Sequence, residues 1–496
     1  MSSSLSGLSS PDSIIKKIHV NHQPKALSIL IPTEMAETYG YFTLQAILVL
    51  YLIKELSYSD ANAYAFSGQF VALAYLMPVI GGWLADRLLG NRIAILLGGL
   101  LLCMGYALLT LGQYSLFAGL SLIVIGNGLF KANISSFIGE FYTQNDSRRE
   151  AGFTLAYTGI NLGSLFAIAG VGYIQKYIGW GACFGAASFA LLLGVSVFRW
   201  GFHYFNNKGL PPNIQSKTLW AFLTNKPAIF LWLCVAFIIV YYLLKDTMFG
   251  TYSIYLIGLL FCLYVAKISQ QLDANARRNL LALMILFLIA TFYKAMFFET
   301  YLVVNVFTDR LVDRTVFGHE IPATVFLSLG SLFTILLGPL IAYIWQSNKI
   351  ILSIPVKFAL SILIVGGCMQ MLAAWLTIET NVILPAASIL FFRFFFAISE
   401  LFILPLGLSM VTEYAPKNCV GLMMGGWYIT AAFGGKLAGI LANYADVPKD
   451  TMDLHHLKTI YHLAFQHYAL LNFVLFAVCL MLVPIINKLL NKRISY

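Results

Sequence analysis

Long apolar segments, separated by short polar connections, make up most of this chain. We count fourteen segments of about 20 residues or longer, which is the length that an α-helix needs to cross the hydrocarbon core of a bilayer. The expected spans are 27–54, 60–85, 92–112, 115–139, 151–175, 181–202, 228–245, 250–270, 280–308, 323–345, 354–377, 382–412, 419–444 and 462–487. The pattern predicts an all-α polytopic membrane protein.

The composition and the distribution of charge agree with this prediction. Hydrophobic residues make up 59% of the chain and charged residues 10%, whereas soluble proteins average about 25% charged residues. The net charge of +10 does not indicate nucleic-acid binding, because most basic residues lie between the apolar segments. Twenty of the 31 lysines and arginines fall on one side of the predicted membrane, seven on the other and four inside segments. The positive-inside rule then places both termini in the cytoplasm.

The connections suggest how the segments are grouped. A long polar connection at roughly 203–227, which contains Pro211 and Pro212, follows the sixth segment. Segments seven and eight contain no embedded charge, so we expect them at the periphery. Two groups of six helices are typical of transporters with two repeated halves around a site at mid-membrane depth. We therefore expect four regions: a cytoplasmic tail at 1–26, an N-terminal six-helix bundle at 27–203, a cytoplasmic linker with an inserted helix pair at 204–279, and a C-terminal six-helix bundle with a short tail at 280–496.

Charges of both signs are embedded in apolar segments: the basic residues are Lys131, Lys294, Arg393 and Lys436, and the carboxylates include Glu34, Glu299 and Glu400. A charge at the centre of a bilayer costs roughly 2.5–3.5 kcal/mol on insertion scales, so such residues usually face a polar cavity and a partner. Charges of both signs on several helices indicate a path for an ion or a polar solute.

Several stretches carry more specific patterns. Residues 126–136 read GNGLFKANISS, residues 152–154 and 157–164 read GFT and YTGINLGS, and residues 399–409 and 423–427 read SELFILPLGLS and MMGGW. These stretches resemble the signatures of the proton-coupled oligopeptide transporter family, and the resemblance covers about residues 27–487. In addition, GGWLADRLLGNR at 81–92 resembles a loop signature of the major facilitator superfamily. There Asp86 and Arg87 are expected to contribute to a cytoplasmic charge latch that gates the protein.

The resemblance implies a fold, an activity and a set of site residues. The fold is the major facilitator fold, with twelve core helices in two bundles plus the inserted pair. The activity is proton-driven symport of di- or tripeptides or peptide-like solutes, with H⁺ as coupling ion and no other cofactor. Lys131 and Glu400 are expected to approach each other across the halves and to act as a gate. The expected proton-coupling residues are Glu34, Glu37, Glu299 and Glu400. The expected substrate contacts are Tyr41, Lys131, Tyr157, Asn161, Glu400 and Trp427.

The chain departs from the family where cations are usual. Thr38 and Gln45 occupy two positions at which the family has positive charges, and Gly330 replaces an asparagine that faces the substrate. The site should therefore be more negative than in typical members, which predicts a preference for peptides with an extra positive group. Lys294 either restores the balance as a counter-ion or extends to an interface.

Two other functions compete with peptide symport. The same fold could carry a different small solute, possibly a cationic one, or bind a ligand as a sensor without transporting it. A membrane enzyme is disfavoured, because the eight histidines lie in tails, loops or segment ends and none has an embedded metal-ligand spacing. We expect a monomer in the inner membrane of a bacterium, surrounded by lipid, with a peptide and protons as partners and with no metal or nucleic acid.

Overall fold

The computed structural model describes residues 23–143, 146, 148–211, 226–346, 352–377, 383–416, 419–449 and 453–490. Within these ranges, fourteen helices have 20 residues or more. They are α2 (Leu27–Lys54), α3 (Asp60–Leu84), α4 (Gly90–Leu109), α5 (Leu116–Glu140), α6 (Arg149–Tyr177), α7 (Trp180–Trp200), α9 (Lys226–Lys245), α10 (Thr247–Ser269), α11 (Ala274–Glu299), α13 (Ala323–Gln346), α14 (Ile354–Leu376), α15 (Ala387–Tyr414), α16 (Val420–Leu441) and α17 (Leu454–Leu489). Most of the expected tail and of the proline-containing connection lies outside the described residues.

Short elements join the long helices. They are the π-helix η1 (Ala85–Leu89), the 3-10 helices η2 (Gly112–Ser115), η3 (Gly201–Phe205) and η5 (Ala442–Ala445), the nine-residue helix α12 (Val303–Leu311), and the strands β1 (Val312–Asp313), β2 (Thr315–Val316), β3 (His319–Glu320) and β4 (Leu384–Pro385). β1 pairs with β4 in parallel, and β2 pairs with β3 antiparallel. These strands are only two residues long, so the fold is all-α in its architecture.

The expected spans match the helices to within a few residues, with two differences. The span expected at 280–308 is two helices, because α11 ends at Glu299 and α12 begins at Val303. The last helix begins at Leu454 instead of 462, where the Asp453 side chain caps it by accepting from the backbone N–H groups of His455 and His456. Twelve helical stretches of the described chain are long and apolar enough to cross a membrane; one of them contains both α3 and α4, and α16 is not among them.

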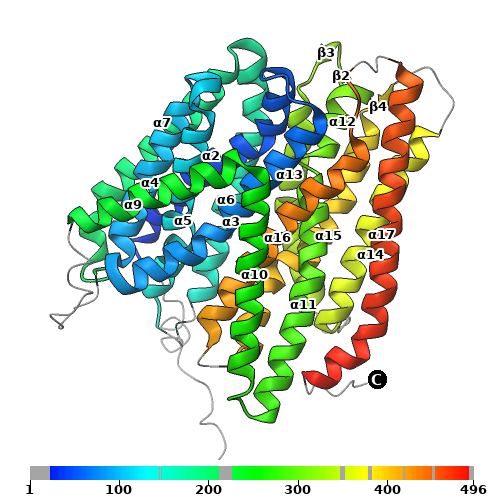
Figure 1. Cartoon of the computed structure of the whole chain (residues 1–496). Helices are drawn as coiled ribbons and strands as arrows, with labels where there is room; N and C mark the ends of the chain where they lie inside the picture. Colours follow the sequence, from blue (N-terminus) through cyan, green and yellow to red (C-terminus); the bar gives the residue numbers. More distant parts are fainter. Residues whose placement is uncertain are drawn as a thin grey trace, which may run out of the picture.

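The long helices form two groups of six (Figure 1). In the first group, α2 packs against α6 and α7, and α4 and α3 pack against α5. In the second, α14 packs against α15 and α17, and α11 packs against α16. Two seams join the groups: α3 contacts α16, and α6 contacts α13. This is the architecture of the major facilitator fold.

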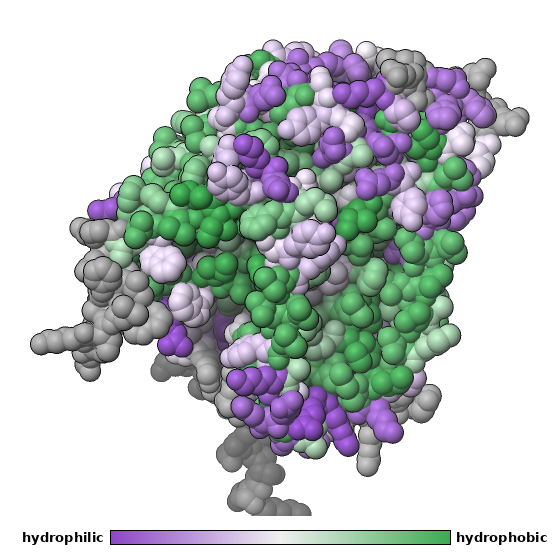
Figure 2. Space-filling model, viewed as in Figure 1, coloured by the Kyte–Doolittle hydropathy of each residue, from purple (hydrophilic) through white to green (hydrophobic). Residues whose placement is uncertain are grey.

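Helices α9 and α10 lie outside both groups (Figure 1). α9 packs on α5, and α10 lies along the seam between α3 and α16. In the most apolar 18-residue window of each helix, only 17% of the α9 residues and 22% of the α10 residues are buried inside the protein. Their remaining side chains face outward, so the inserted pair is peripheral, as the lack of embedded charge predicted. Figure 2 shows the corresponding surface, on which a hydrophobic band lies between hydrophilic residues at the two ends.

Candidate functional site

Lys131 of α5 is the centre of a charged cluster in the first group of helices. Its Nζ lies 3.7 Å from a carboxylate oxygen of Glu37 on α2 and 4.1 Å from the centre of the Tyr41 ring, which is a cation–π geometry. Glu34, one helical turn from Glu37, also interacts electrostatically with Lys131. Glu34, Glu37 and Tyr41 are each at most 5% exposed, whereas the Lys131 side chain is 24% exposed. Two carboxylates thus share a single ammonium group.

This cluster extends to the second group of helices. Tyr75 of α3 lies 5.6 Å from Lys131, ring centre to Nζ, and Tyr428 of α16 is close enough to interact electrostatically with Lys131, Glu34 and Glu37. Neither tyrosine was a sequence candidate. With 27 tyrosines in the chain, residue type alone could not single them out.

The expected contact between Lys131 and Glu400 is not formed in this structure. The ion pair of Lys131 is made with Glu37 of its own group, and Glu400 of α15 instead accepts a hydrogen bond of 3.4 Å from the Thr334 hydroxyl of α13. Thr334 was not a sequence candidate. The two charges therefore keep local partners on separate halves, and the interpretation of Lys131 and Glu400 as a direct ion pair does not describe this conformation.

Glu400 meets the first group of helices at Tyr157 of α6. The Tyr157 side chain is 40% exposed and lies within electrostatic range of Glu400. Asn161, one turn further along α6, is partly exposed and donates its amide to the Tyr157 carbonyl at 2.9 Å. The structure thus brings Tyr157, Asn161 and Glu400 into one neighbourhood at the junction of the two groups.

Lys294 and Trp427 form a buried pair inside the second group. The Lys294 Nζ lies 3.8 Å from the centre of the Trp427 ring and donates to the Trp427 carbonyl at 3.0 Å and to the Thr430 hydroxyl at 2.8 Å. Both side chains are less than 10% exposed. Lys294 is therefore neither at an interface nor placed as a counter-ion for the Lys131 cluster. Trp427 is covered by Lys294 and by Gly407, where a Cβ would lie 1.9 Å from the tryptophan ring.

Two further embedded charges lie deeper in the second group. Glu299 is fully buried, and its carboxylate forms no ion pair among the described residues but faces the backbone N–H of Val303 at the start of α12. Arg393 of α15, 3% exposed, donates to the carbonyl of Thr300 at 3.2 Å. The structure places Arg393 next to Gly330, since a Cβ at Gly330 would lie 4.0 Å from its side chain. The sequence marked Arg393 only as an embedded cation.

Asp86 and Arg87, the residues of the expected latch, interact electrostatically with each other. Both residues lie in η1 with exposed side chains. Further polar links at this end run to Glu140 of α5, whose carboxylate accepts from the Asn91 amide at 2.5 Å and from the Gly209 N–H at 2.9 Å. Glu140 was not recognised from the sequence, because it lies at a helix end where charges are common.

The two groups of helices are held together at the end where α2 ends and α3 begins. Arg310 of α12 binds both carboxylate oxygens of Asp60, at 2.5 and 2.9 Å, and Lys54 pairs with Asp309 at 2.6 Å. In the adjacent connection, the Arg314 guanidinium holds the pKa of the Glu320 carboxyl below its usual range. Bidentate arginine–carboxylate contacts are strong and directional, so these ion pairs link the two groups of helices at this end.

Comparison with known proteins identifies the family. A family model described as the POT family matches residues 92–460, which is more than half of the chain. The chain belongs to the POT family. It is a membrane transporter of the major facilitator fold and not an enzyme. Within the residues described, no group of three or more metal-ligating side chains could hold a metal ion.

Relatives of this POT-family member match over almost its whole length. Dipeptide and tripeptide permease A of Salmonella typhimurium is 28% identical over 471 residues, which is 94% of this chain and 93% of the relative. The same permease of Citrobacter koseri is 27% identical with the same coverage. A crystal structure of the peptide transporter POT in complex with sulfate has a TM-score of 0.81 and 27% identity, and the match covers 95% of this chain and 96% of that one.

Proposed function

We propose that this POT-family transporter imports di- or tripeptides by symport with protons, through alternating access of its two halves. The observation that carries the proposal is the placement of embedded charges at the junction of the halves. Glu34, Glu37 and Lys131 lie on one side, and Glu400 lies on the other. A purely structural role would explain them poorly, because buried ion pairs stabilise proteins less well than apolar packing does. The names of the permease relatives support a peptide as substrate.

Proton coupling is supported by the imbalance of charge around Lys131. If Glu34 and Glu37 are both ionised, one negative charge lacks a partner, so the cluster can bind one proton or one substrate cation. Glu299 and Glu400 are further buried carboxylates that can take up protons. A proton removes the cost of burying the Glu299 charge, which has no cationic partner among the described residues, whereas Glu400 interacts electrostatically with Arg393. Inward movement of one positive charge gains about 2.3 kcal/mol per 100 mV of membrane potential.

The same imbalance supports a preference for peptides with an additional positive group. Thr38 and Gln45 supply no cation on α2, and Lys294 is bonded to Trp427 and Thr430 instead of the carboxylates. Lys131 is then the main anchor for the substrate carboxylate. Because the substrate carboxylate and Glu37 compete for Lys131, substrate binding is linked to the release of Glu37 from its ion pair.

We further propose an inner-membrane monomer with both termini in the cytoplasm. The bundles at 27–203 and 280–496 would be the moving halves and residues 204–279 an accessory insertion. The packing of α2 to α7 and of α11 to α17 supports this division. With α2 beginning in the cytoplasm, the ion pairs around Arg310 lie on the external side, which supports an inward-facing state.

Uptake by reconstituted protein tests the proposal. Proteoliposomes with an inward proton gradient should accumulate labelled Ala-Ala, and a protonophore should abolish the accumulation. Folded protein that accumulates none of a dipeptide library under a proton gradient would contradict the transport activity. A sensor would bind dipeptides in a thermal-shift screen and still fail in counterflow.

Competition for the labelled dipeptide tests the charge preference separately. Unlabelled Ala-Lys should inhibit more strongly than Ala-Ala, and Ala-Glu more weakly. Inhibition by Ala-Glu that equals or exceeds that by Ala-Lys would refute the preference while leaving peptide transport intact.

A further inference from the structure

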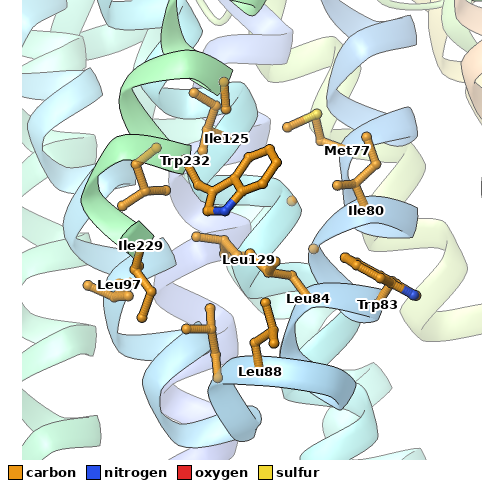
Figure 3. Close-up of a pocket in the computed structure, with 15 residues that line it drawn as sticks. Met77, Ile80, Trp83, Leu84, Leu88, Leu97, Ile125, Leu129, Ile229 and Trp232 are labelled. Carbon is orange, nitrogen blue, oxygen red and sulfur yellow. The ribbon is translucent and has the colours of Figure 1, made fainter. Parts of the chain in front are cut away.

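An apolar pocket of about 200 Å³ lies between α9 of the inserted pair and the first group of helices. Its walls come from α3, η1, α4, α5 and α9. In Figure 3, Trp232 and Ile229 of α9 lie across the pocket from Leu84 and Leu129, and Leu88 of η1 lies at its lower end. The lining side chains are aliphatic or aromatic, so the pocket offers contact to hydrocarbon and little to a polar solute.

The pocket exists because two helices cross without side chains between them. α3 and α5 meet at Gly81 and Gly128, and a Cβ on Gly81 would lie 2.0 Å from the Gly128 carbonyl oxygen. The floor of the pocket at these glycines is therefore flat backbone. α9 contributes the small Ala236 and the ring of Trp232 to the wall opposite this floor, and Trp232 lies in the middle of the view in Figure 3.

The pocket is reached from the surrounding membrane. Ile80, Trp83 and Trp232 line it and are each about half exposed, at 50%, 49% and 51%. They belong to outward-facing surfaces of helices that cross the bilayer. A molecule in the pocket would thus enter sideways from the hydrocarbon phase. An apolar cavity of about 150 Å³ is large enough to bind a benzene ring, so one segment of an acyl chain fits here.

Charge at the lower end of the pocket favours an anionic head group. Leu88 and Leu89 directly follow Arg87, whose side chain is exposed. Arg92 near the start of α4 and Lys208 also lie at this end, against the carboxylates of Asp86 in η1 and Glu140 at the end of α5, so these five residues, Arg87 included, carry an excess of one positive charge. Basic residues next to a membrane attract anionic lipids.

We propose that this pocket is a binding site for an anionic phospholipid, with one acyl chain between Trp232 and the Gly81–Gly128 crossing and the head group near Arg87. The bound chain completes the packing of α9 on the first group of helices. The site is separate from the charged cluster at Lys131 and does not depend on which solute is transported.

Quenching of Trp232 tests the site in the wild-type protein. Wild-type and Trp232→Phe proteins are placed in lipid nanodiscs with increasing amounts of phosphatidylglycerol brominated on its acyl chains. The difference between their fluorescence isolates Trp232, and its quenching should saturate at a low fraction of brominated lipid. Trp200, 68% exposed at the end of α7 and outside the pocket, serves as control through Trp200→Phe, and its quenching should rise in proportion to the lipid. Equal curves for the two tryptophans, or equal quenching by brominated phosphatidylcholine and phosphatidylglycerol, would overturn the proposal.

A matched pair of α9 variants tests the pocket by filling it. Ala236→Phe places a ring in the pocket, whereas Ile238→Phe adds a ring on an exposed position of the same helix (54% exposed). Native mass spectrometry of detergent-purified protein should show one retained phosphatidylglycerol on the wild type and on Ile238→Phe, and at least a fivefold loss on Ala236→Phe. Equal retention by all three, or equal loss by both variants, would refute the site.

Discussion

Replacing Lys131 by alanine leaves Glu37 buried without its ion-pair partner. Glu37 is 3% exposed, and its distance of 3.7 Å to Lys131 is the shortest that Lys131 makes to a carboxylate. The Coulomb energy of two unit charges at this distance is about 4 kcal/mol at an effective dielectric constant of 20. Because Lys131 is 24% exposed and can hydrate, the measured interaction should be smaller, about 1–3 kcal/mol, which lies within the range of about 0.5–3 kcal/mol found for residues in contact.

Two double-mutant cycles convert this estimate into a test. The first combines Lys131→Ala with Glu37→Gln, and the second combines Lys131→Ala with Glu400→Gln. The free energy of unfolding in detergent micelles should show coupling of about 1–3 kcal/mol in the first cycle and additivity within about 0.5 kcal/mol in the second. Proton-driven uptake of Ala-Ala should be lost in Lys131→Ala and stay lost when Glu37→Gln restores stability.

The outcome distinguishes the observed ion pair from the one expected from the family resemblance. Larger coupling between Lys131 and Glu400 than between Lys131 and Glu37 would show that the cross-half contact dominates in solution and would refute the reasoning. Normal pH-driven uptake by Lys131→Ala would exclude Lys131 from the gate altogether.

Three further predictions follow from the packing of single residues. Glu299→Gln should not lower the unfolding temperature at neutral pH, because an amide removes an unpaired buried charge, and uptake rates should depend less on external pH; a drop of several degrees would contradict this. Glu400→Ala should abolish proton-driven uptake of Ala-Ala while leaving membrane insertion intact, as checked by proteoliposome assay and membrane fractionation. Gly250→Ala should destabilise the protein, since a Cβ there would lie 2.4 Å from the backbone carbonyl oxygen of Leu243, which cannot move aside as a side chain can. Gly367→Ala, with open space around it, should be neutral or stabilising by about 0.5–1 kcal/mol in thermal unfolding.

The sequence predicted the helices well because the membrane simplifies the problem. A span must be apolar and about 20 residues long, so hydropathy located the long helices to within a few residues. The break between Glu299 and Val303 was missed, because α12 continues the same apolar pattern after two irregular residues. The motifs also identified Lys131 and Glu400 as embedded charges that lie at the junction of the two groups.

The partners of these charges could not be read from the sequence. Whether Lys131 contacts Glu37 or Glu400 depends on the rotation of α5 and on the state of the two halves. The contact between Lys436 and Gln69 joins residues 367 positions apart, and neither lies in a motif. Lys294 illustrates the same limit: the sequence offered a counter-ion or an interface, and the structure instead gives it a backbone carbonyl and a hydroxyl.

One side chain connects the inserted pair to both halves of the transporter. Gln69 of α3 accepts from Lys436 of α16 at 3.0 Å and donates to the carbonyl of Leu243, at the end of α9, at 3.4 Å. If the halves rock apart at this seam, the bond to Lys436 must break or the turn between α9 and α10 must move with it. We therefore expect the inserted pair to move when this seam opens, and a fluorescent label on Tyr252→Cys, an exposed position near this turn, would report the conformation of the transporter.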